Sequence, residues 1–226
     1  MSILTQLLLI IAIAIIGYFA VMIYRHDNTA FYKLTGYSYF DLWTNKKARM
    51  THNLVKASDT AKGPHKILVN LQIPVNDSLQ TIDAVLLHES GIYIICVKEM
   101  TGWINGREQD FQWTQLLHKN QSRLFENPIH ETKRLSYALQ DQLSELNETL
   151  FNSVVLFTND CSFQQIEVQS TNVEVTKVSG LKKWVSSLNG KHITETEIQT
   201  IYAALEGMMN VKNSTVKVEN TVASTN

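Results

Sequence analysis

The feature that most constrains this chain is an uncharged apolar run at its N-terminus. Residues 3–24 contain no Asp, Glu, Lys or Arg. As a helix this run would extend about 33 Å, slightly more than the roughly 30 Å hydrocarbon core of a bilayer. A cleaved signal peptide has a basic residue before a shorter apolar core, and this run has neither property. We therefore expect residues 1–25 to form one transmembrane helix, with a buried core helix as the alternative.

Basic residues follow the apolar run, whereas none precedes it. Arg25, Lys33, Lys46, Lys47 and Arg49 are opposed by few acids. Because positively charged flanks stay on the cytoplasmic side of a membrane, we expect a single-pass protein of the cell membrane whose soluble domain faces the cytoplasm.

The overall charge excludes a strongly basic nucleic-acid binder. The chain has 20 Lys and Arg against 21 Asp and Glu, so any contact with nucleic acid must be local. The two cysteines, Cys96 and Cys161, do not form a disulfide framework and are expected to be free thiols in a reducing compartment.

The rest of the chain divides by composition into three further segments. Residues 26–62 are a polar, aromatic juxtamembrane segment with a helix near its end, residues 63–209 form the folded domain, and residues 210–226 are expected to be a disordered tail. Short apolar runs bounded by turn residues predict strands, at 67–73, 82–88, 92–98, 151–158 and 172–178. Helical spacing predicts helices after residue 127 and around 180–188 and 195–209. This order predicts an α/β fold with one mixed central sheet flanked by helices.

Two local sequence signals predict a hairpin turn and the start of a helix. Asn105-Gly106 predicts a hairpin turn between residues 103–104 and the segment 111–117. Asn127 followed by Pro128 predicts the start of an amphipathic helix.

Charged residues stand at both ends of the earlier hairpin, which residues 82–88 and 92–98 are predicted to form. If Ser90-Gly91 forms its two-residue loop, Asp83 lies opposite Lys98, and Cys96 shares their face because strand side chains alternate. A three-residue loop would place Asp83 and Lys98 on opposite faces of the sheet.

A carboxylate and a lysine on one sheet face suit metal-assisted hydrolysis of a phosphodiester. Carboxylate oxygens hold Mg²⁺, the ion activates a water, and the ammonium stabilises the developing charge. The alternative is a pair of solvated strand ends with no site between them.

The segment IDAVLLHESGIYIICVKEMTGWING, followed by FQWTQLL and ENPIHETKRL, resembles the NERD (nuclease-related) domain, a branch of the PD-(D/E)XK nuclease-like superfamily. The likeness runs from about residue 41 to about residue 160. It implies a restriction-endonuclease-like fold and a nucleic-acid-related function, and several bacterial members also resemble this chain in having an N-terminal membrane helix.

The chain departs from the pattern of the family it resembles at three polar positions. The family usually has Ile-Glu-x-Lys where this chain has Cys96 before Lys98, tends to have Gly-Glu where it has Met50-Thr51, and has Gln where it has Glu131. The implied catalytic residues are Asp83, Lys98 and Glu131, and the implied metal ligands are Asp83, Glu131 and Cys96. A sulfur ligand suits Zn²⁺ better than Mg²⁺, so Mg²⁺ binding is expected to be weak or absent.

Three functions remain open. The loss of metal-binding charge favours a membrane-anchored, nucleic-acid-related protein with degenerate or lost nuclease activity. Alternatively, Glu131 supplies the missing carboxylate, and the chain is an active Mg²⁺-dependent nuclease using Asp83, Glu131 and Lys98. In the third reading the chain is a protein-interaction scaffold at the membrane. The expected partners are the membrane and, as candidates, DNA or RNA, without a small-molecule cofactor; the oligomeric state is left open.

Overall fold

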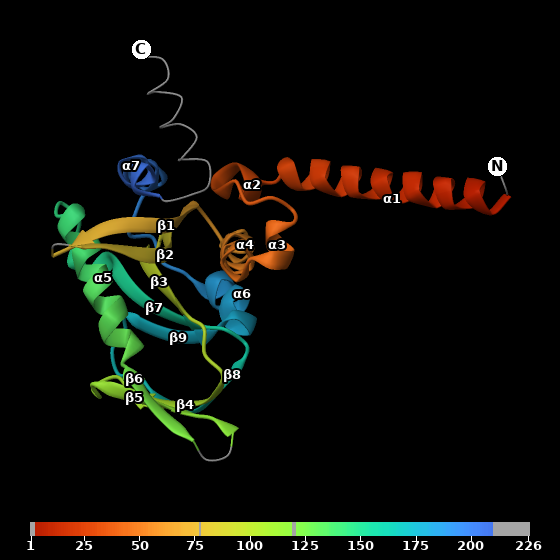
Figure 1. Ribbon diagram of the computed structural model, residues 1–226. Helices are drawn as coiled ribbons and strands as arrows, with labels where there is room; N and C mark the ends of the chain where they lie inside the picture. The colour runs from red at the N-terminus through yellow and green to blue at the C-terminus, as the bar shows by residue number, and fades with distance from the viewer. Residues whose placement is uncertain (1–2, 77, 119–120, 210–226) are drawn as a thin grey trace, which may run out of the picture. The chain divides into compact units, whose positions relative to one another are not determined.

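The computed structural model describes residues 3–76, 78–118 and 121–209 and divides them into two compact units, residues 3–52 and 53–209 (Figure 1). The predicted disordered tail, residues 210–226, lies outside the described residues. Each unit is considered by itself.

The N-terminal unit is helical. Its helices are α1 (Ile3–Asp27), α2 (Ala30–Thr35), α3 (Asp41–Thr44) and the first part of α4 (Lys46–Ser58). Helix α1 covers the predicted apolar span and is long and apolar enough to cross a membrane. None of its most apolar stretch is buried by the protein, unlike the core helix that was the alternative.

A five-stranded mixed sheet forms the larger part of the second unit, in the order β1-β2-β3-β7-β9. Strands β1, β2 and β3 are antiparallel, whereas β3, β7 and β9 run parallel to one another. The strands are β1 (His65–Val75), β2 (Ser78–His88), β3 (Gly91–Lys98), β7 (Phe151–Phe157) and β9 (Val173–Lys177).

A second, four-stranded sheet has the order β6-β5-β4-β8. It contains β4 (Gly102–Arg107), β5 (Gln112–Leu116), β6 (Ser122–Glu126) and β8 (Cys161–Glu167). Strands β6 and β8 are largely exposed, so they lack the buried apolar run by which a strand is recognised in a sequence. The mixed α/β class is confirmed, with the strands divided between two mixed sheets.

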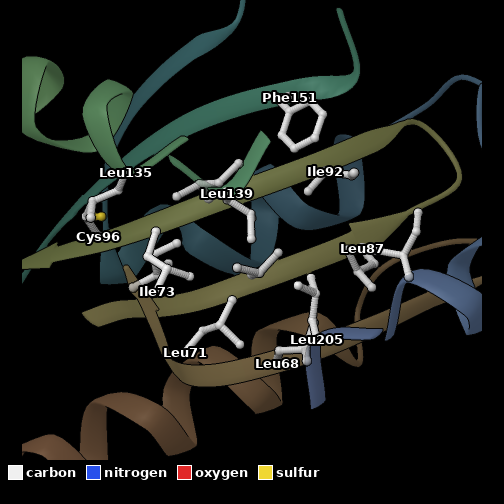
Figure 2. Close-up of a cluster of buried hydrophobic side chains, with 14 of the residues drawn as sticks. Leu68, Leu71, Ile73, Leu87, Ile92, Cys96, Leu135, Leu139, Phe151 and Leu205 are labelled. Carbon is white, nitrogen blue, oxygen red and sulfur yellow. The ribbon is translucent and has the colours of Figure 1, made fainter. Parts of the chain in front are cut away.

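Helices cover the five-stranded sheet. Figure 2 shows the core beneath α5 (Pro128–Gln142), in which Leu135 and Leu139 pack among side chains of β1, β2 and β3. Helix α7 (Glu195–Leu205) adds Leu205 to the same cluster. On the other face, Trp184 of α6 (Val178–Ser187) packs edge-on against Tyr93 of β3. The described residues also include the 3-10 turns η2 (Glu148–Leu150) and η3 (Glu206–Met208).

A second core joins the two sheets around Trp113, whose ring stacks on Phe157 with centroids 6.3 Å apart. A Cβ atom at Gly106 would lie 2.2 Å from the Trp113 ring. The prediction of a turn at Asn105-Gly106 was therefore wrong: β4 continues through both residues, and the glycine serves close packing instead of chain reversal.

Candidate functional site

The hairpin that carries the predicted site has a two-residue loop. His88 pairs with Gly91, so the loop consists of Glu89 and Ser90, and the prediction of Ser90-Gly91 was wrong by one residue. Moving a loop by one residue shifts the strand pairing by two residues. Because the side-chain period of a strand is also two, this shift alone does not move a side chain to the other face of the sheet.

Asp83 is therefore displaced from Lys98 but still belongs to the same group of side chains. Its Oδ2 accepts a hydrogen bond of 2.7 Å from the backbone N–H of Val97. Cys96 and Lys98 lie on one face of β3 because they are two residues apart. Asp83 and Lys98 both act electrostatically on the Cys96 thiol, which shows that the three side chains are close.

Helix α5 brings Glu131 to this face. The Asn127 side chain caps the helix by accepting a hydrogen bond of 2.9 Å from the N–H of Ile129, and Pro128 occupies the first turn, as the sequence predicts. Glu131 in that turn accepts a hydrogen bond from the Lys98 ammonium through Oε2. The structure thus brings Asp83, Lys98 and Glu131 together around Cys96, while their catalytic roles remain predictions.

The same Asn127 also holds the β4–β5 turn. Its amide Nδ2 donates to the backbone carbonyl oxygens of Arg107, Glu108 and Asp110 at 3.2, 2.9 and 2.7 Å. Asn127 is fully buried, so its amide group must find its hydrogen-bond partners within the protein, and these carbonyl groups supply them. The first turn of α5, and with it Glu131, is consequently fixed to the second sheet.

Cys96 is the centre of the group and is 3% exposed. Burial raises the pKa of its thiol to about 12, and the negative charges of Asp83 and Glu131 contribute in the same direction. A hydrogen bond with Thr132 and the positive charge of Lys98 act in the opposite direction but are weaker. In the absence of a bound metal ion, the thiol is therefore neutral at physiological pH and packs as a small buried side chain.

These donors fit a divalent metal poorly. Within residues 3–76, 78–118 and 121–209, no group of three His, Cys, Asp or Glu side chains is arranged to hold a metal ion. Asp83 and Glu131 offer hard oxygen atoms, but each carboxylate already accepts a hydrogen bond from the protein. The metal-binding roles of Asp83, Glu131 and Cys96 accordingly stay predictions, and no reaction step is derived through a metal.

The chain also departs from the family pattern at Met50-Thr51, which lies in α4. Thr51 is buried and donates a hydrogen bond of 2.9 Å to the carbonyl oxygen of Lys47 in its own helix. A hydroxyl engaged in this way supplies no charge where the family tends to have a glutamate.

Sequence reasoning missed a second charged cluster, centred on Glu108. Its carboxylate accepts hydrogen bonds from Lys133 Nζ at 2.7 Å, from the N–H groups of Gln169 and Ser170 at 2.7 and 2.8 Å, and from the Ser170 hydroxyl. Burial would raise the pKa of Glu108, but these hydrogen bonds together outweigh it and hold the pKa at about 2. Glu108 lies in the polar stretch after β4, which resembles an ordinary exposed turn, so no local signal could have identified it.

The structure contains a mixed α/β fold, a hairpin that ends in Lys98 and a capped helix, as the resemblance to a nuclease-related family implies. The sequence matches that family, NERD, over residues 44–158, more than half of the chain. The chain belongs to the NERD family.

The sequence is also similar to that of a bacterial protein. An uncharacterized protein of Bacillus anthracis is 29% identical over 125 residues, which cover 54% of this chain and 56% of the relative. The chain thus spans little more than half the length of that relative.

Proposed function

We propose that this chain is a membrane-anchored, nuclease-related protein with a nucleic-acid-related role in which hydrolysis is lost or strongly reduced. The observation that carries the proposal is the buried, neutral thiol of Cys96, on which the charges of Asp83 and Lys98 both act. Metal-assisted hydrolysis needs negative oxygen ligands to hold the ion and activate water, and this position supplies neither charge nor oxygen.

The membrane part of the proposal rests on α1. The helix is long and apolar enough to span a bilayer, and basic residues follow it. With a spanning α1, the positive-inside rule places the nuclease-related domain on the cytoplasmic side.

A second candidate is an active Mg²⁺-dependent nuclease that uses Asp83, Glu131 and Lys98. The contact between Lys98 and Glu131 favours it, because this contact brings a second carboxylate to the Cys96 face. Mg²⁺ is commonly held by one or two carboxylates together with phosphates of the substrate, so two carboxylates would suffice if Glu131 exchanged Lys98 for the ion.

A nuclease assay on the full-length protein in detergent micelles separates the two candidates. Labelled DNA and RNA, single- and double-stranded, are incubated with Mg²⁺ or Mn²⁺. We expect no cleavage above that of Asp83→Ala. Metal-dependent cleavage by the wild type that Asp83→Ala abolishes would establish the active nuclease and overturn the proposal.

Restoring the family residues sharpens the test. The double variant Cys96→Glu with Glu131→Gln moves one carboxylate from α5 to β3 and keeps the net charge unchanged. We expect this variant to gain metal-dependent cleavage, whereas the matched control Cys96→Gln with Glu131→Gln gains none. Thermal unfolding of each variant verifies that it is folded.

The proposed nucleic-acid role is tested by measuring DNA and RNA binding with the same protein preparation. Binding of labelled DNA or RNA is expected to weaken as the salt concentration rises, because phosphate contacts release counterions. Absence of binding at low salt would favour the protein-interaction scaffold instead.

A further inference from the structure

We propose that residues 37–49, here called the interfacial segment, lie in the headgroup region of the membrane beside α1 and bind anionic phospholipid. This inference rests on the proposed membrane anchoring and adds a second contact with the bilayer. It concerns the N-terminal unit alone.

The chain turns back immediately after α1. His26, near the end of the helix, is buried, and its Nε2 donates a hydrogen bond of 2.8 Å to the carbonyl oxygen of Tyr37. The His26 ring also contacts Phe31 and Tyr39, with centroids 5.8 and 6.0 Å away. These contacts hold the start of the interfacial segment against the C-terminal end of α1.

The position of Phe40 along α1 sets the depth of the segment. Its ring lies 6.1 Å from that of Phe19, which precedes Arg25 by about 9 Å along the helix axis at the usual helical rise. Phe40 is therefore beside the apolar part of α1 and not beyond its end. If Arg25 lies at the headgroups, Phe40 reaches the boundary between headgroups and acyl chains, the depth to which interfacial segments insert.

Large aromatic side chains of the segment are exposed in the protein itself. Phe40 is 50% exposed and Trp43 is 64% exposed, and Tyr39 contacts both rings. Aromatic rings of this kind are enriched where a membrane meets water, because an apolar ring and a polar edge both find a suitable environment there.

The charges around these rings favour an anionic surface. Residues 25–49 contain five Lys and Arg and two Asp. Asp41 accepts hydrogen bonds from the N–H and the hydroxyl of Ser38, so one of the acids is engaged within the protein. Arg49 donates a hydrogen bond of 3.0 Å to the carbonyl oxygen of Trp43, which ties the basic start of α4 to the aromatic part of the segment.

Continuity with α1 selects lipid as the occupant. A segment held beside a spanning helix at this depth meets headgroups before it meets any soluble partner. Clustered basic residues directly cytoplasmic of such a helix attract anionic lipids, and the exposed rings supply the apolar contact.

The test measures how near Trp43 is to lipid. The full-length protein is reconstituted into vesicles of phosphatidylcholine with phosphatidylglycerol, in which part of the lipid carries bromine near the headgroup end of the acyl chains and quenches nearby tryptophan fluorescence. We expect Trp43→Phe to remove most of the quenching. The matched control Trp103→Phe removes a tryptophan that is 46% exposed in the other unit and should leave the quenching unchanged.

Charge reversal tests the lipid preference. In vesicles without phosphatidylglycerol, and in the variant Lys46→Glu with Lys47→Glu, we expect weaker quenching of Trp43. Equal quenching with and without the anionic lipid would overturn the anionic preference.

Extraction with alkaline carbonate separates this inference from the proposed anchor. If the wild type stays in the membrane pellet but Trp43 is not quenched, the proposed location of the interfacial segment in the headgroup region is wrong, and the proposed membrane anchor stands. If carbonate releases the wild type, the anchor fails, and this inference fails with it.

Discussion

Two lysine–glutamate pairs are built on the first turns of α5, and they differ in how completely the carboxylate is satisfied. Glu108 is 8% exposed and accepts hydrogen bonds from a lysine, a hydroxyl and two backbone N–H groups. Glu131 accepts from Lys98, and the side chains of this pair are 30% and 22% exposed. The two lysine side chains are similarly exposed, 26% for Lys133 and 22% for Lys98, so the difference lies in the carboxylates: Glu108 is enclosed by the fold, whereas Glu131 is partly exposed.

The difference separates a structural cluster from a candidate functional one. A carboxylate with all its acceptor sites filled has no capacity for a ligand and stabilises the loops that surround it. A partly exposed pair contributes little stability, and its partners can be exchanged. The Glu131 pair is therefore the candidate for binding or chemistry that we propose, while the Glu108 cluster holds the surrounding loops together.

The largest effect is expected at Asn127, which supports both pairs. Asn127→Ala removes the helix cap and a buried amide that donates to three backbone carbonyl groups, so the free energy of unfolding should fall by about 2–4 kcal/mol. Denaturant unfolding followed by tryptophan fluorescence measures the change. Asn127→Ser keeps a capping oxygen and should recover about 1 kcal/mol. An alanine variant as stable as the wild type would show that Asn127 does not join the start of α5 to the β4–β5 turn.

The next largest effect is expected at Glu108. Glu108→Gln should lower the free energy of unfolding by about 2 kcal/mol at pH 7, because a buried charged acceptor is lost. The pKa of Glu108 in the folded protein, about 2, is below its ordinary value of 4.5. Its contribution is thus present above about pH 4.5 and is lost as the pH falls toward 2.

The pH dependence gives a direct check on this contribution. The difference in unfolding free energy between the wild type and Glu108→Gln should shrink between pH 5 and pH 2. Glu126→Gln, in an exposed pair with Arg134, is the matched control and should show almost no difference. A gap that stays constant over this range would argue against the low pKa of Glu108.

A smaller effect is expected at Cys96. Because the thiol is neutral and buried, it behaves as a small apolar side chain, and Cys96→Val should change the free energy of unfolding by about 1 kcal/mol or less. Chemical denaturation measures this change, with Cys161→Val, at the other buried thiol, for comparison. A loss of several kcal/mol at Cys96 alone would show that the thiol does more than fill space.

The smallest effect is expected at Glu131. Glu131→Gln should lower the free energy of unfolding by about 0.5 kcal/mol, as is usual for a partly exposed ion pair. The same unfolding measurement at low and high salt tests the value, since salt screens exposed pairs. If Glu131→Gln cost as much as Glu108→Gln, the distinction between the two pairs would fail.

Much of the fold could be predicted because its signals are local. The apolar run of α1, the three strands from β1 to β3, and the Asn127-Pro128 helix start each depend on residues that are neighbours in the chain. The strands β6 and β8 were not predicted, because their side chains are mostly exposed and their pairing depends on partners distant in sequence.

The candidate site was predicted in part for the same reason. Alternation along β3 determines that Cys96 and Lys98 share a face. The position of the loop, one residue earlier than predicted, could not be read from Ser90-Gly91, since several two-residue loops satisfy the same composition.

The sequence by itself determined an apolar N-terminal helix, the mixed α/β class and the shared face of Cys96 and Lys98 on their strand, since each follows from a periodicity or a run of adjacent residues. Only the tertiary structure decided that Glu131 contacts Lys98, that Cys96 is neutral, and that Glu108 is enclosed. Contacts between distant segments, and the burial that sets a pKa, arise when helices and sheets pack, and no local pattern encodes them.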